Sequence, residues 1–290
     1  MIEGGPNAYN ALLLALLPKI HHLQYHGPMG DLRQHDFITR FSSQGWFEGC
    51  LNDIRSVRMN RINGLLQDKE VHTVMTLPGL RKLLLINYHL VSSIVTTNLL
   101  QPYTSGVRVL DLALEFSSNS SDMSTLCRVI AACRSLRILR ITQCRYSDGF
   151  NYTALMEAIM CHPSTLERLE LGTRGAWDEG SLWLRDSRGL SVFNRLTHLL
   201  VPWHACVPTA EHNQHQQVDP MTVFKSLPTS LTHLALTPLR LGWPREGLPP
   251  FSINLSGHRG FHRGQPVLGG PSIAALEASE ARVIRSEKQY

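Results

Sequence analysis

The sequence lacks a hydrophobic run long enough to cross a membrane. In this chain of 290 residues the longest apolar stretch, 11–17, has seven residues and stops at Pro18. A membrane-spanning helix needs about twenty apolar residues. The opening letters MIEGGPN also lack the basic segment with which a secretory signal peptide begins. We therefore expect an intracellular protein, in the cytoplasm, the nucleus or both.

Paired cysteines and metal-ligand spacings are missing as well. The six cysteines lie far apart, with no C-x-x-C pair, which favours free thiols in a reducing compartment over a disulfide framework. The His and Cys residues that come closest along the chain are Cys161, His162, His204, Cys206, His212 and His215. Structural zinc needs four convergent ligands at recurring spacing, so we expect core or solvated side chains here, and no metal or cofactor.

The sequence has no motif of a known catalytic site. It contains no G-x-S-x-G, no glycine-rich phosphate loop and no paired-carboxylate signature. Its net charge of +5 is mild, and residues 239–290, with seven Lys/Arg against four Glu, supply +3 of it. The nearly neutral remainder shows no basic stripe with interleaved aromatics. We expect neither enzymatic activity nor a nucleic-acid partner.

What the sequence does contain is a repeat. The pattern L-x-x-L-x-L, seen in SLRILRI at 135–141, recurs with first positions at Ile20, Leu80, Val107, Leu136, Leu166, Leu196 and Leu231. The successive spacings are 60, 27, 29, 30, 30 and 35 residues, a regularity that indicates a repeat architecture. Because the first spacing is twice the period, we expect one degenerate unit at about residues 45–60.

The segments between the copies have helical patterns. Residues 88–100, 123–134 and 151–163 space apolar side chains by three or four, as one helix face requires, although β-branched residues weaken the pattern in the first segment. Asp122 or Ser124 could cap the second helix. Each unit therefore reads as helix, turn and strand.

Neither the helix face nor the strand of one unit can be buried alone. Stacking the units gives a continuous core, and right-handed connections make all strands parallel. We expect an α/β solenoid with parallel strands on the concave side and helices on the convex side. A period of 27 to 30 residues with a helix per unit is the long class of leucine-rich repeat. Over about residues 10–240 the chain resembles leucine-rich-repeat proteins of the ribonuclease-inhibitor-like kind.

A narrower resemblance rests on ALLLALLPKIHHL at 11–23, RLTHLLVPWHA at 195–205 and LPTSLTHLAL at 227–236. These stretches are similar to fungal F-box/leucine-rich-repeat proteins, in which an F-box docks on a ubiquitin-ligase scaffold and the repeat arc holds substrate. LPKI resembles the L-P-x-E-[IL] opening of an F-box, but Gly27 and Pro28 break the helix that should follow. The F-box itself is not found: either this member lacks it, or the sequence is a truncated form.

The strand pattern also places candidate binding residues. Positions one, four and six should point into the core, and positions three, five and seven should line the concave face. Of the side chains expected on that face, the candidate binding residues are Lys82, Asp111, Arg140, Arg168, Glu170, His198 and His233. Arginines beside exposed aliphatic residues are typical of a protein-binding surface, and a plain solvated sheet face is the alternative. Trp177, Trp183 and Trp203 are expected to fill turns, with an exposed aromatic hot spot as the alternative.

The pattern stops near residue 240. We divide the chain into a degenerate leucine-rich-repeat domain, 1–240, and a Gly/Pro/Arg-rich tail, 241–290, largely disordered apart from a short helix that 272–288 can form. Residues 207–219 read as an exposed loop. Repeats of this kind carry Asn or Cys three positions after the third leucine, and here only Cys144 fits, so we expect irregular curvature.

These observations predict a non-enzymatic interaction module. It would bind a protein partner on the concave face of the arc, and the resemblance implies a substrate receptor of F-box type. The alternative is a stand-alone or truncated scaffold with no role in ubiquitin ligation.

Overall fold

The computed structural model describes part of the chain in detail. The described residues are 19–26, 51–91, 100–115, 120–145, 152–173, 188–202, 227–237 and 251–254. The chain divides into two compact units, Met1–Leu255 and Ser256–Tyr290, and all of the described residues belong to the first unit.

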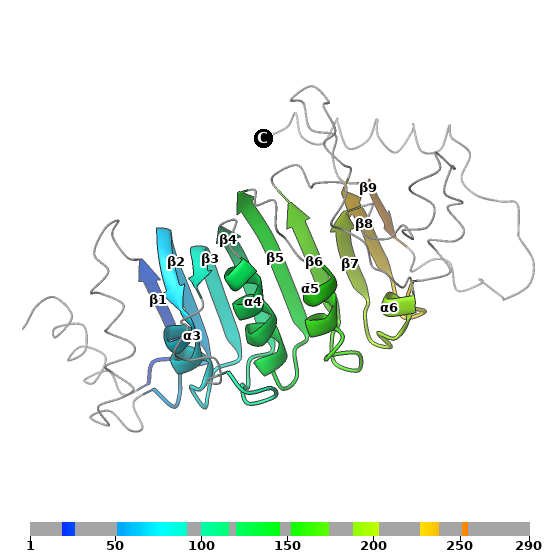
Figure 1. Cartoon of the computed structure of the whole chain (residues 1–290). Helices are drawn as coiled ribbons and strands as arrows, with labels where there is room; N and C mark the ends of the chain where they lie inside the picture. Colours follow the sequence, from blue (N-terminus) through cyan, green and yellow to red (C-terminus); the bar gives the residue numbers. More distant parts are fainter. Residues whose placement is uncertain are drawn as a thin grey trace, which may run out of the picture. The chain divides into compact units, whose positions relative to one another are not determined.

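One sheet runs through the whole of this unit (Figure 1). Its strands are β1 His22–His26, β2 Ser56–Gln67, β3 Lys82–Val91, β4 Val109–Glu115, β5 Ile138–Arg145, β6 Arg168–Thr173, β7 His198–Pro202, β8 His233–Thr237 and β9 Phe251–Asn254. The spatial order of the nine strands equals their order in the sequence. Strands β1 to β8 are parallel, and β9 adds to β8 in the antiparallel direction. The expected α/β class with parallel strands is confirmed.

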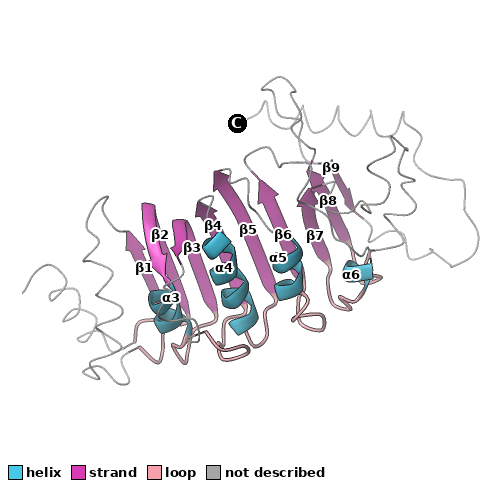
Figure 2. Ribbon diagram, viewed as in Figure 1, coloured by secondary structure: helices cyan, strands magenta, loops and turns pink. Residues whose placement is uncertain are grey.

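The described helices connect successive strands. They are α3 Asp68–Met75, α4 Ser120–Ala132, α5 Tyr152–Ile159 and the single turn α6 Arg188–Ser191. Helices α3, α4 and α5 lie against the same face of the sheet (Figure 2). Parallel strands need such crossovers, because each chain segment must return to the starting edge before the next strand begins. Among the described helices, none has the length and apolar character needed to cross a membrane.

The repeat pattern explains the core. The first-position residues that are buried are Ile54, Leu80, Val107, Leu136, Leu166, Leu196 and Leu231. The fourth-position residues, whose side chains stack in the same register one strand after another, are Val57, Leu83, Leu110, Leu139, Leu169, Leu199 and Leu234. Burying one leucine fully contributes about 1.5–3 kcal/mol, so this ladder is the main source of stability.

The degenerate unit expected at residues 45–60 is present. Strand β2 begins at Ser56, and the letters IRSVRM at 54–59 follow the pattern, with Ile54 and Val57 0% exposed and Met59 2% exposed. Isoleucine, valine and methionine replace the leucines, which is why the copy is hard to see in the sequence. It fills the double spacing between the copies at Ile20 and Leu80.

Three expectations about local structure need correction. The helix expected at 88–100 is wrong over its first four residues, because β3 continues to Val91 and buries Tyr88 and Leu90 there. Residues 92–99 lie outside the described part. Helix α4 begins at Ser120, so Asp122 and Ser124 are its third and fifth residues and neither can be its N-cap. Helix α3 was not expected, because its segment has a mostly polar composition.

The edge beyond β8 also differs from expectation. Strand β9 lies in 241–290, the segment assigned to the tail, and pairs with β8 from His233–Asn254 to Leu236–Phe251. It lacks the L-x-x-L-x-L pattern, which is why sequence reading missed it. The rest of 241–290 lies outside the described residues, as does the loop expected at 207–219.

Candidate protein-binding surface

The described helices lie on one face of the sheet (Figure 2), and we call the opposite face the open face. The fourth position of each copy of the pattern is buried or partly buried against the core, so strand alternation places the third and fifth positions on the open face. Their side chains line up because the strands are in register. The third-position row is His22, Ser56, Lys82, Val109, Ile138, Arg168, His198 and His233, and the fifth-position row is Gln24, Arg58, Leu84, Asp111, Arg140, Glu170, Leu200 and Ala235. All of these side chains are at least partly exposed, as the pattern predicted.

A cluster of alternating charges occupies the middle of the open face. Asp111, Arg140 and Glu170 are neighbours on β4, β5 and β6. Arg140 Nη1 lies 3.5 Å from Asp111 Oδ2, and its Nε lies 3.0 Å from Glu170 Oε2 without hydrogen-bond geometry. Arg168 Nε contacts the other oxygen of Glu170. These side chains, 20–41% exposed, hold one another in place and still face solvent.

A patch of partly exposed aliphatic side chains adjoins this cluster. It consists of Leu84, Ile86, Val109, Ala113 and Ile138, from β3, β4 and β5. Protein-binding patches combine an apolar centre, which excludes water, with charges that set specificity. The open face has this composition, because aliphatic side chains lie next to the charge cluster.

Two histidines stack at the far end of the third-position row. The rings of His198 and His233 have centroids 4.2 Å apart and planes that differ by 5°. Thr197 Oγ1 donates to the Glu167 carbonyl at 3.0 Å, so its lone pair must accept from His198 Nδ1 at 2.9 Å. Thr232 makes the same pair of contacts with Thr197 and His233. In the neutral rings Nδ1 therefore carries the hydrogen, and Nε2 is left as an acceptor.

The surroundings of His198 favour its neutral state. Burial lowers the pKa of His198, and the nearby His233 and Arg168 lower it further. Parallel rings cannot both direct Nε2 at one metal ion, because a metal lies in the plane of each imidazole that binds it. No group of three or more His, Cys, Asp or Glu side chains suited to a metal occurs in the described part of the chain.

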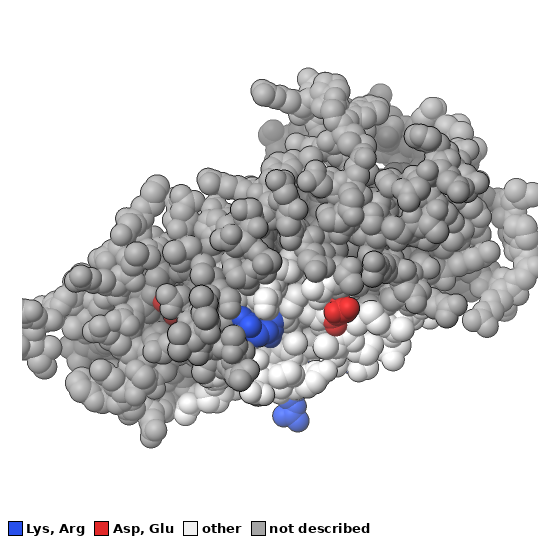
Figure 3. All heavy atoms as spheres, in the orientation of Figure 1, with Lys and Arg blue, Asp and Glu red and all other residues white. Residues whose placement is uncertain are grey.

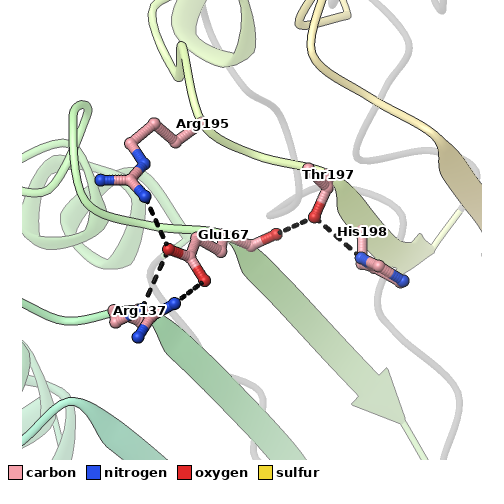
Figure 4. A network of polar contacts seen from close by, with 5 residues as sticks. All are labelled: Arg137, Glu167, Arg195, Thr197 and His198. Atoms are coloured by element: carbon pink, nitrogen blue, oxygen red, sulfur yellow. Dashed lines mark hydrogen bonds and ion pairs between the residues drawn. The ribbon is translucent and has the colours of Figure 1, made fainter.

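A second charged network lies where the strands begin (Figure 4). Arg137 donates two hydrogen bonds to Glu167, from Nε to Oε1 at 2.9 Å and from Nη2 to Oε2 at 2.7 Å. Arg195 Nη2 donates to Glu167 Oε1 at 3.1 Å. The hydrogen bond from Arg137 is the main cause that holds the pKa of Glu167 below its usual value. Glu167 is thus a carboxylate shared by two arginines.

Six of the seven expected binding residues are brought together. Asp111, Arg140, Glu170 and Arg168 form the charge cluster, and the two stacked histidines continue from Arg168. Lys82 is exposed on the same face, but Val109 and Ile138 separate it from Arg168 in the third-position row.

Sequence reading missed the arginines at the second position. Arg55, Arg81, Arg108 and Arg137 follow the first-position residue in four successive rungs and are all exposed. The signal was present in the copies IRSVRM, LRKLLL, VRVLDL and LRILRI, whose second letter is the same. It was overlooked because only the core and concave positions of the pattern were considered.

The other residues considered as site candidates give no site within the described part. His162 is buried, and its Nε2 lies 3.0 Å from the Ile130 carbonyl, which makes it a satisfied core histidine. Cys127, Cys133 and Cys161 are free thiols, and burial raises the pKa of Cys127 to about 11 and of Cys133 to about 12, which leaves both unreactive. Outside the described side chains lie Cys144, His204, Cys206, His212, His215, Trp177, Trp183 and Trp203.

The described charges form separate groups on the side of the molecule that carries the helices. Among the described residues drawn in Figure 3, blue and red side chains stand at separate places between uncharged ones, and one basic side chain projects at the lower side of the view.

Comparison of the chain with protein-family models, with curated proteins and with solved structures found no match in any of the three.

Proposed function

We propose that this chain is a leucine-rich-repeat solenoid that binds a protein partner on the open face, the concave side of such an arc, and has no enzymatic activity. Eight parallel strands in sequence order support the architecture, and each begins at the third position of a copy of the L-x-x-L-x-L pattern or its apolar variants. Repeat arrays of this kind present an extended sheet surface, which suits them to protein recognition.

One observation carries the proposal: an aliphatic patch lies beside preorganised charges on a sheet face that none of the described helices covers. Parallel sheets are usually covered on both faces and then carry apolar residues on both. Here all the described helices that pack on the sheet lie on one face, and the other face mixes Ile138 and Val109 with Arg140 and Glu170. Because Arg140 is already held between two carboxylates, ordering it on binding costs little entropy.

The experiment compares photo-crosslinking at two single sites of the full chain. One photoreactive residue replaces Ile138 on the open face, and the other replaces Ser124, which is exposed on α4. A partner that crosslinks from position 138 and whose binding is lost in Ile138→Lys but kept in Ser124→Lys supports the proposal. Crosslinks from position 124 alone, or equal loss in both lysine variants, would contradict it.

Within this function we propose a substrate receptor of F-box type that acts inside the cell. The support is the resemblance over 11–23, 195–205 and 227–236. Against a complete F-box at LPKI stands strand β1, which begins at His22 directly after it. The second candidate is therefore a scaffold with no role in ubiquitin ligation. Binding of purified ubiquitin-ligase scaffold components to the full chain separates the two: no binding removes the F-box assignment and leaves the interaction module intact.

A further inference from the structure

A row of arginines runs along the edge of the sheet where the strands begin. The backbone of each member bonds the one before it: Arg81 N donates to Arg55 O, Arg108 N to Arg81 O and Arg137 N to Arg108 O, each at 2.8 Å. Neighbouring strands lie about 4.8 Å apart, so four guanidinium groups start from points spaced by that distance. We call these four residues the arginine row.

Three members of the row have no acidic partner among the described residues. Arg55, Arg81 and Arg108 are exposed, and no ion pair joins them to an acidic residue in the part of the chain that the structure describes. Arg81 Nη1 donates to the Leu80 carbonyl at 2.9 Å and to the Pro78 carbonyl at 3.2 Å, which leaves its other donors available. Like charges on adjacent strands repel one another, so the row by itself opposes folding.

The fourth member reveals which ligand the row accepts. On the strand after Arg137 the second position is Glu167, and its carboxylate takes both hydrogen bonds of the Arg137 fork, at 2.9 and 2.7 Å. Planar guanidinium and carboxylate groups match in this bidentate geometry. The one described carboxylate at the second position of a neighbouring rung, that of Glu167, is therefore bound by the arginine beside it.

We propose that Arg55, Arg81 and Arg108 bind an acidic segment of a partner protein, which lies extended across the starts of β2, β3 and β4 and offers carboxylates to them. This surface is distinct from the open face and goes beyond the function proposed above. From Arg55 to Arg137 the row spans about 14 Å, which an extended peptide covers with four or five residues. Glutamate or aspartate at alternate positions puts carboxylates on one side of such a peptide, within reach of the long arginine side chains.

Charge alone would also attract single-stranded nucleic acid, but the surroundings favour a peptide. Single-strand sites combine cations with exposed aromatic rings on which bases stack. Among the side chains that the structure describes, Tyr103 is the exposed aromatic, 51% accessible, and its ring packs edge-on against His162 with centroids 6.5 Å apart. Within the described residues the row is bordered by one imidazole, His21, whose carbonyl accepts from Arg55 N and whose Nδ1 lies 3.1 Å from the Asp53 carbonyl, and at its other end by Glu167. One ring at one end does not make the series of rings on which successive bases stack.

The test is fluorescence anisotropy of the full chain with a labelled eight-residue peptide that alternates glutamate and serine. Arg81→Gln with Arg108→Gln should weaken binding about tenfold, because two ion pairs are lost. The matched control is Arg58→Gln with Arg168→Gln, which removes the same charge from the open face and should change binding less than about threefold. Arg108→Lys, which keeps the charge but loses the fork, should fall between the two.

Three outcomes would overturn the proposal. The first is no measurable binding of the peptide at low ionic strength, where exposed charges interact most strongly. The second is an equal loss in the two double variants, since the peptide would then respond to net charge alone. The third is tighter binding of a twelve-residue oligodeoxythymidine through Arg81 and Arg108, which would assign the row to nucleic acid. Unchanged urea-unfolding midpoints in the variants verify that a loss of binding is not a loss of fold.

Discussion

The first and second halves of the sheet share one core and differ at the second position of their rungs. Directly before β2, β3 and β4 this position is arginine, and none of the described carboxylates pairs with these arginines. Directly before β5 and β6 the same position supplies Arg137 and Glu167, which bind each other. Directly before β7 and β8 the position is threonine. The hydroxyl of each threonine bonds the histidine that follows it and a backbone carbonyl of the preceding rung. At this position the second half pairs its polar side chains with one another, while the described part of the first half has arginines without a carboxylate.

Each rung of the repeat combines a buried core residue, which gives stability, with a second-position residue at the edge of the sheet, which lies outside the core. The buried ladder makes each rung stable, and it hardly varies along the chain, because it requires only apolar side chains of the right volume. The second position lies outside that ladder and can vary without affecting the fold. The two halves should therefore respond alike to changes in the core and differently to changes at the edge.

The largest effect should be the same in both halves. Leu110→Ala on β4 and Leu169→Ala on β6 each remove a fully buried side chain from the fourth-position row. Each should lower the free energy of unfolding by about 3 kcal/mol, the usual cost of a large-to-small change in a close-packed core. Urea denaturation of the two variants measures this. A cost confined to one variant would show that the halves do not share one core.

A glycine pair should show a difference caused by backbone packing. A Cβ added to Gly79 would overlap the Asn52 carbonyl oxygen and lie 2.9 Å from the Ile54 oxygen, whereas at Gly172 its nearest neighbour, Thr142 Oγ1, is 3.7 Å away. Gly79→Ala should cost about 2 kcal/mol, because a backbone contact must open, and Gly172→Ala should be nearly neutral or slightly stabilising. Urea midpoints that shift equally in the two variants would refute the close approach of the two turns.

The second half should also be the acid-sensitive one. Burial lowers the pKa of His162 and of His198 below the ordinary value of about 6.5. The unfolded chain therefore takes up protons first, and stability should fall as the pH decreases through that value toward the lowered folded-state pKa. The urea midpoint should drop between about pH 7.5 and 5.5, and His198→Gln should drop less than the native chain. An equal decrease of the urea midpoint in the native chain and in His198→Gln would show that His198 does not cause the loss of stability in acid.

The residues that were predictable from the sequence are those fixed by periodicity. Leu136, Leu139 and Ile141 could be assigned to the core, and Arg140 to the open face, because strand alternation leaves no other choice once the repeat is recognised. The strand order followed from the same regularity. The pairing of Arg140 with Asp111 was not predicted, but it results from the register that the equal spacing of the copies produces.

What could not be predicted depends on contacts that local patterns do not encode. The extension of β3 to Val91 depends on pairing with β2, which also continues past a register shift at Asn60. Strand β9 joins the sheet antiparallel and needs no repeat pattern to do so. The isolation of Lys82 from the other candidates reflects two aliphatic residues on intervening strands, and their effect is visible only when the rungs are placed side by side.

The variant with the smallest expected effect on stability, Glu167→Gln, tests the difference between the two halves of the sheet most directly. Glu167→Gln removes the carboxylate that occupies Arg137 and makes β5 resemble β2, β3 and β4 at the second position. The stability change should be slight, since Arg137 is 51% exposed and exposed ion pairs contribute little. Arg137 holds the pKa of Glu167 low, so this contribution is present above the ordinary value of about 4.3 and is lost as the pH falls through the lowered one. The two proteins should therefore become equally stable in acid.

Binding should change in the opposite direction. With Arg137 released, a fourth cation joins the arginine row, and the glutamate–serine peptide should bind about threefold more tightly, as one added exposed ion pair allows. Glu170→Gln is the matched control, because Glu170 also lies between two arginines, Arg140 and Arg168, but on the open face. It should leave peptide affinity almost unchanged, apart from the small general effect of one charge. Equal gains in the two variants would mean that the peptide senses net charge and not the row, and the contrast between the halves would then concern the fold alone.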